Sequence, residues 1–213
     1  KELDEIIAAR AQAAEILSQI GAHYGQVRSK WEALVAKGAK EPSLAQKIQA
    51  FSVTLQGMRE THAQATPQAF ATLVTQGDEA SAALKALEAQ LEAFEALITQ
   101  AETALIEGEH RIALAKQTCD GLQTSDLTLD LSYALLDEAV EVYKQAREQQ
   151  AKGTWHGYQM ATSLAEQAGQ KAFQAAEEAS SAAQKASWLW EERSKGIPEV
   201  RMALQERAQA VET

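Results

Sequence analysis

The chain has 213 residues, a formal net charge of −10 and one cysteine, and alanine alone occupies 43 positions. Glycine and proline are few, at 11 and 3, and asparagine is absent. A fold rich in strands and tight turns normally needs more of these residues and more β-branched ones. Because most of the remaining residues are good helix formers, we expect an all-α protein with long helices.

The charge and the apolar pattern also limit the partners. An acidic chain without clustered lysine and arginine lacks the surface that binds nucleic acid, and no expected helix has the basic face that binds anionic membranes. No apolar run reaches the roughly 20 residues that span a bilayer. The chain begins with Lys1 rather than Met, so we expect a piece of a larger protein, and its cytoplasmic or extracytoplasmic location stays open.

Hydrophobic periodicity and helix punctuation predict helices that alternate between long and short. Thr66 and Thr154 are expected N-caps, and glycines after Lys37, Gln76, Asp120, Lys152 and Lys195 are expected stops. The predicted helices cover residues 1–36, 43–63, 67–76, 78–120, 126 or 130 to 152, and 154–195, followed by a last segment from Pro198.

The punctuation repeats at a nearly constant interval. Lys37-Gly38, Asp120-Gly121 and Lys195-Gly196 are 83 and 75 residues apart, and Gly77 and Gly153 are separated by 76. This interval predicts a structural repeat of the kind found in helical arrays. We therefore expect a first repeat at residues 1–77, a second at 78–153, and a partial third at 154–213 whose long helix continues from the second.

Three long helices have a 3-4 hydrophobic seam. In the last one the seam is mostly alanine, which buries little area, so this part is expected to be the less stable. Gly108 occupies a seam position, where it either admits a neighbouring helix or marks a bend. The seam of the central helix is the longest: Leu84, Leu87, Leu91, Phe94, Ile98, Ala101, Leu105, Gly108, Ile112, Ala115, Cys119 and Leu122.

Regular glycine and proline interruptions favour intramolecular bundles over a two-stranded coiled coil, because the helices of such a coiled coil run on without hairpin turns. We expect elongated tandem antiparallel three-helix bundles, with long helices shared between consecutive repeats. In this layout the chain resembles spectrin-like repeats, including those of bacterial septation-ring regulators. The resemblance extends over the whole chain as a pattern, without a diagnostic motif, and it implies no catalytic or binding residues.

Polar residues give no convincing catalytic or metal site. Glu107 and His110 form half of a di-iron Glu-x-x-His motif, but the chain has no second copy, and the heptad register places both away from the seam. The glycines stand singly, so no phosphate-binding loop is expected. Cys119 lies on the seam and is expected to be a buried structural thiol. We expect no cofactor and no catalytic residues.

Four aromatic residues are the candidate partner-binding positions: Trp155, Tyr158, Trp188 and Trp190. Trp188 and Trp190 flank the seam residue Leu189. The first interpretation is that they pack beneath the helix that follows Gly196, at a junction of repeats. The second is an exposed aromatic anchor, because tryptophan is enriched at binding hot spots.

The function expected from these features is that of a non-enzymatic structural or interaction module, a helical rod that spaces or scaffolds parts of a larger protein. Its partners would be other proteins or other domains of the same chain. We expect a monomer, with a dimer left open. The alternative is a sensor bundle that holds a small molecule between helices, lined by the same four aromatic residues.

Overall fold

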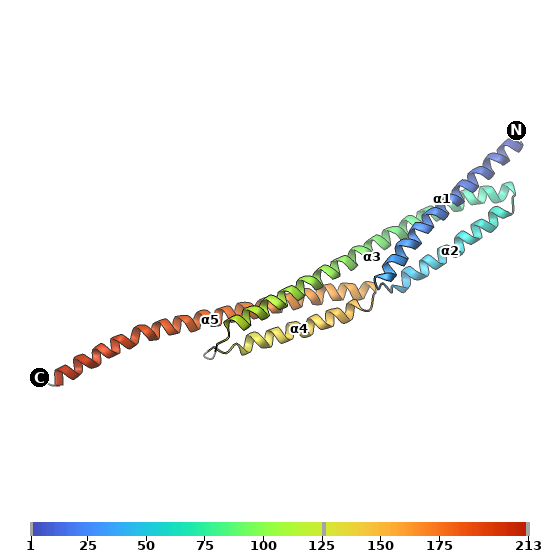
Figure 1. The fold of residues 1–213 in the computed structure, drawn as a ribbon. Coiled ribbons are helices and arrows are strands. Elements are labelled where there is room, and N and C mark those ends of the chain that lie inside the picture. Colours follow the sequence, from blue (N-terminus) through green and yellow to red (C-terminus); the bar gives the residue numbers. More distant parts are fainter. Residues whose placement is uncertain (1, 125–126, 212–213) are drawn as a thin grey trace. The chain divides into compact units, whose positions relative to one another are not determined.

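The computed structural model describes residues 2–124 and 127–211, and this part of the chain is all-α, as predicted. Outside the helices it contains an isolated β-bridge between Thr124 and Leu127. The described helices are α1 (Glu2–Ala36), α2 (Pro42–Ala63), α3 (Pro67–Leu122), α4 (Asp130–Gln150) and α5 (Trp155–Val211), as Figure 1 shows.

Local capping signals placed several helix ends correctly. The Thr66 hydroxyl accepts a hydrogen bond from the Ala69 N–H at 3.1 Å, at the start of α3. The Thr154 hydroxyl accepts one from the Gly157 N–H at 3.1 Å, at the start of α5. Of the two predicted starts of α4, Asp130 is the observed one, and Asp126 lies outside the described residues.

Two predicted helix ends are wrong, because α3 continues through Gly77 and α5 continues through Gly196 and Pro198. The difference lies in the backbone. Among the described glycines, Gly38 and Gly153 have positive φ angles, of 100° and 69°, which is the left-handed conformation that ends helices. Gly77 and Gly196 keep helical geometry, so neither of them ends its helix.

Gly77 has a packing role in place of the expected stop. A Cβ atom built on it would lie 2.5 Å from Cγ2 of Ile16 on α1. A side chain there would overlap Ile16, so glycine is what permits this close approach of α1 and α3.

The chain divides into two compact units. Unit 1 consists of the described residues of Lys1–Glu102 together with Glu148–Ala161, and unit 2 consists of Thr103–Arg147 together with the described residues of Thr162–Thr213. Each unit therefore draws on both long helices, α3 and α5.

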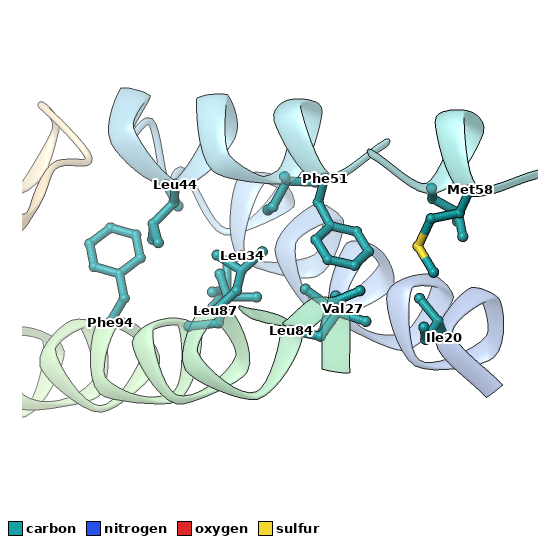
Figure 2. Packing of buried hydrophobic residues seen from close by; sticks show 14 of the residues in the cluster. Ile20, Val27, Leu34, Leu44, Phe51, Met58, Leu84, Leu87 and Phe94 are labelled. Atoms are coloured by element: carbon teal, nitrogen blue, oxygen red, sulfur yellow. The ribbon is translucent and has the colours of Figure 1, made fainter. Parts of the chain in front are cut away.

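Unit 1 is built around a large apolar core to which α1, α2 and α3 all contribute. Four α1 residues from Ala13 to Leu34 and the α3 seam residues from Leu84 to Ala101 lie in it, and α2 adds about one buried side chain per turn (Figure 2). Its leucine and phenylalanine side chains account for most of the buried volume and hence most of the hydrophobic stabilisation. The labelled core residues in Figure 2 are Ile20, Val27, Leu34, Leu44, Phe51, Met58, Leu84, Leu87 and Phe94.

Unit 2 has several small clusters in place of one large core. The face of α5 that packs here is almost entirely alanine, and the fully buried members are Ala165, Ala168, Ala172, Ala175 and Ala179. A Cβ atom on Gly108 of α3 would lie 3.0 Å from the Ala165 carbonyl oxygen. Gly108 therefore permits the close helix approach that was one of its two predicted roles.

Candidate interaction surface

Trp155 and Tyr158, two of the four predicted partner-binding residues, lie in the core of unit 1. Their ring centroids are 4.8 Å and 5.7 Å from that of Phe94. Tyr158 is 2% exposed, and Trp155 is partly buried against the same cluster. Both residues stand in the first turn of α5, which the Thr154 cap and the left-handed Gly153 direct into unit 1.

Trp188 and Trp190, the other two, belong to unit 2 and are exposed by 61% and 74%. Leu189 between them is 60% exposed. The predicted packing beneath a helix after Gly196 is wrong, because α5 does not turn back there. The structure thus separates the four residues into a packed pair in unit 1 and an exposed pair in unit 2, and their role in binding a partner stays a prediction.

The exposed tryptophans stand where α5 extends past the rest of unit 2. The helix α3 ends at Leu122 and α4 begins at Asp130, whereas α5 continues to Val211. Figure 1 shows this last part of α5 beyond the end of α3 and the start of α4. Leu189 and Trp190 line a groove together with Leu122 at the end of α3. Farther along α5, Ile197, Val200 and Met202 are 57–60% exposed.

Four of these side chains share one face. An α-helix turns by about 100° per residue, which places Leu189, Trp190, Ile197 and Val200 within about 100° of arc. We name these four residues the tail stripe. The buried alanines from Ala161 to Ala179 fall on the same side of the helix, whereas Trp188 and Met202 fall on the opposite side. The tail stripe therefore continues the face with which α5 packs in unit 2.

A groove of about 970 Å³ begins where the packed part of α5 gives way to the tail stripe. Leu122, Thr124 and Leu127 form one wall, and α5 forms the other. The lining residues are Leu122, Thr124, Leu127, Ala183, Ala186, Ser187, Leu189, Trp190, Glu191 and Arg193. Apolar side chains from both walls make it a continuation of the tail stripe.

The Glu107–His110 segment forms ordinary surface ion pairs. Glu109 accepts hydrogen bonds from the Tyr143 hydroxyl at 3.0 Å and from the Arg147 guanidinium at 3.3 Å, and Glu107 lies 3.9 Å from Arg111. Within residues 2–124 and 127–211, no cluster of three histidine, cysteine or acidic side chains has the arrangement of a metal site. Glu109 therefore connects α3 to α4 in unit 2, whereas the Glu107–Arg111 pair lies within α3.

Cys119 is fully buried beside Leu129 and Ala179, which confirms the predicted buried thiol. Burial raises the pKa of this thiol, and the nearby Asp120 carboxylate raises it further. A thiol in this environment stays protonated near neutral pH and reacts slowly.

None of the described helices combines the length and the apolar character needed to span a membrane. No family model, curated protein or solved structure matches this chain. The resemblance to spectrin-like repeats therefore rests on the sequence pattern alone.

One signal of the tail stripe was present in the sequence. The 3-4 seam of α5 continues across the expected stop, through Leu189, Gly196 and Val200. Lys195-Gly196 and Pro198 predict a helix end, and this expected end concealed the continuation of the helix. Arg193 and Gly196 occupy the seam positions between Leu189 and Val200, so the apolar pattern across the expected stop is interrupted and was a weak signal of helix continuity.

Proposed function

We propose that the chain is a non-enzymatic helical module that spaces or scaffolds parts of a larger protein. One observation supports this proposal above the others: α3 contributes residues 67–102 to unit 1 and 103–122 to unit 2 without a break. Its 56 residues correspond to about 84 Å of helix. A helix shared in this way would join the two units without a flexible linker.

We further propose that the units are consecutive three-helix bundles. Their bounds differ from the repeats expected at 1–77, 78–153 and 154–213, so that division of the chain stays a prediction. In this arrangement α5 would have the same linking role as α3, since it contributes Trp155–Ala161 to unit 1 and its following residues to unit 2. The function would be geometric, since it would depend on the length and stiffness of the shared helices. The acidic surface would limit non-specific association.

Small-angle X-ray scattering, measured in line with size-exclusion chromatography and light scattering, tests the proposal. A compact 213-residue monomer has a radius of gyration of about 17 Å. Two bundles end to end, joined by a helix that rises 1.5 Å per residue, should have a radius of gyration above roughly 28 Å. A monomeric mass with the larger radius supports the spacer, and the smaller radius contradicts it.

A pair of variants tests the shared helix itself. Proline at Glu102, the last α3 residue of unit 1, removes a helix hydrogen bond and clashes with the preceding turn. We expect Glu102→Pro to reduce the radius of gyration and Glu102→Ala to leave it unchanged. Equal radii for the two variants would contradict a role for helix continuity.

The small-ligand sensor is the weaker of the two functions. Its proposed lining consisted of Trp155, Tyr158, Trp188 and Trp190, and the first two already contact Phe94 in a packed core. A saturable shift in tryptophan fluorescence during a metabolite screen would favour the sensor over the spacer.

A further inference from the structure

We propose that α4 is a releasable helix, which separates from α3 and α5 at its N-terminal end while its C-terminal end stays attached to unit 1. In the closed state α4 and the preceding Leu129 cover the buried alanine face of α5 and the thiol of Cys119. In the open state both become accessible to solvent and to reagents. The proposal goes beyond a spacer, because it gives unit 2 two states.

The small apolar area that α4 buries is the first argument. The helices α2 and α4 have nearly equal lengths, of 22 and 21 residues. All five buried residues of α2 are large and apolar, whereas Leu136 is the one such residue that α4 buries, beside Ser132, Ala139 and Ala146. Alanine removes far less apolar surface from water than leucine or phenylalanine does, so the hydrophobic effect holds α4 more weakly than α2. The buried residues of α2 are Leu44, Ile48, Phe51, Leu55 and Met58.

The polar contacts between α4 and α3 lie at the surface and offset little of this difference. The Tyr133 hydroxyl donates a hydrogen bond to Asp120 at 2.8 Å, and Glu109 accepts from Tyr143 and Arg147. Both tyrosines are only partly buried, and the two carboxylates are 49% and 64% exposed. Water competes for exposed polar and charged groups, so such contacts contribute little to stability.

Charge distinguishes the two helices further. The helix α4 has five acidic and two basic residues, and its neighbours in unit 2 are acidic as well: residues 103–122 have three acidic and two basic residues, and residues 162–182 have three acidic and one basic. The helix α2 has one acidic and two basic residues, and it packs with the acidic segments 2–36 and 67–102. The net charges therefore attract α2 to its neighbours and repel α4 from its own.

The two ends of α4 are held differently. Its last residues, from Glu148 onward, belong to unit 1. The turn that follows them is fixed there by Lys40, whose ammonium donates a hydrogen bond to the Ala151 carbonyl oxygen at 3.4 Å and whose backbone N–H donates to that of Gly153 at 2.7 Å. The other end, at Asp130, adjoins a cluster of three buried residues. Opening therefore begins at Asp130 and proceeds toward a fixed C-terminal end.

Hydrogen exchange of the full chain, followed by mass spectrometry, measures the opening of each helix. After correction for the intrinsic exchange rates, we expect the amides of residues 134–146 to exchange at least about 100-fold faster than those of residues 46–60 of α2. Within α4, protection should rise from residues 134–139 to residues 144–149. Equal exchange of α2 and α4, or protection that falls toward the C-terminal end of α4, would overturn the proposal.

A matched pair of variants tests whether α4 opens by itself. Leu136→Ala in α4 and Leu55→Ala in α2 make the same change at side chains that are 5% and 3% exposed. We expect Leu136→Ala to raise the rate at which a thiol reagent modifies Cys119 by at least about tenfold, and Leu55→Ala to leave it within about threefold of the wild type. Equal acceleration by the two variants, or none by Leu136→Ala, would overturn the proposal.

The two measurements support each other. Circular dichroism checks that both variants fold, and the exchange experiment uses the wild type, so it decides the question even if one variant does not fold. Neither measurement depends on the radius of gyration, so the spacer is tested separately.

Discussion

The carboxylate of Glu41 accepts a hydrogen bond from the backbone N–H of Trp155, which lies 3.0 Å away and 114 residues later in the chain. Its other oxygen accepts hydrogen bonds from the Ser43 hydroxyl and N–H, at 2.8 Å and 3.4 Å. One side chain thus caps the N-termini of α2 and α5, where a negative charge also interacts favourably with the helix dipoles.

Backbone contacts support the same junction within unit 1. The Lys40 N–H donates to the Gly153 carbonyl oxygen at 2.7 Å. A Cβ atom at Gly153 would overlap the Gly38 carbonyl oxygen. The turn between α1 and α2 and the turn between α4 and α5 therefore pack directly on each other, with a left-handed glycine in each.

Removing the Glu41 carboxylate should uncap both helices. We expect Glu41→Ala to lower the free energy of unfolding by about 1–3 kcal/mol, because caps and buried N–H groups lose their acceptor. Urea unfolding followed by tryptophan fluorescence measures the change. The control is Glu148→Ala, an exposed residue of α4, which should stay within about 0.5 kcal/mol of the wild type. Equal losses for the two variants would contradict the double cap.

The same carboxylate predicts a pH dependence. Burial acts to raise the pKa of Glu41, but the hydrogen bonds from Trp155 and Ser43 outweigh it and lower the pKa below the ordinary 4.5. A lowered pKa stabilises the folded state above the unfolded-state value, and this stabilisation is lost as the pH falls through the folded-state pKa. The stability difference between the wild type and Glu41→Gln should therefore be largest near pH 7 and shrink below about pH 4.5. A difference independent of pH would show that the charge contributes nothing.

Gly77 should be intolerant of a side chain even though it lies inside a helix. Gly77→Ala places a methyl group against Ile16, and overpacking of this kind costs about 1–3 kcal/mol. The matched control is Gly57→Ala, on the exposed side of α2 with no atom within 4 Å of its new Cβ. It should stabilise by about 0.5–1 kcal/mol. In an Ile16→Ala background the cost of Gly77→Ala should fall, and an unchanged cost would rule out this contact.

Cys119 is a reporter for the opening of unit 2. Its burial and raised pKa should make the reaction with a thiol-specific reagent at pH 8 at least about 100-fold slower in the folded protein than in urea. Ser187, which is exposed on α5, provides the comparison: Ser187→Cys in a Cys119→Ala background should react at the unfolded rate without urea. Rapid labelling of native Cys119 would contradict the packed cluster around it.

Local chemistry determined the helical class, the seams and several helix ends. Thr66 and Thr154 predicted helix starts because the hydroxyl oxygen of an N-cap residue accepts a hydrogen bond from a nearby backbone N–H. Both hydrogen bonds are observed. The leucine and phenylalanine seam of the central helix predicted a buried face, since its period matches that of a helix face, and its residues from Leu84 to Ala101 lie in the core of unit 1. These features depend on residues within a few turns of one another.

Four glycines show where local information was insufficient. Gly38 and Gly153 end helices with positive φ angles, whereas Gly77 and Gly196 lie inside helices. Lysine precedes Gly38, Gly153 and Gly196 alike, so the dipeptide does not distinguish a stop from a continuation. Gly77 faces Ile16, and Gly153 faces the turn that contains Gly38. Those contacts join residues far apart in the sequence.

The sequence by itself determined that Trp188 and Trp190 flank a seam. It favoured packing beneath a following helix and left an exposed position as the second interpretation. The tertiary structure decided between them. The neighbouring helix α3 ends at Leu122 and α4 begins at Asp130, whereas α5 continues to Val211. Whether an apolar side chain is buried depends on which other segments reach it, and that is a property of the packed chain rather than of the helix that contains it.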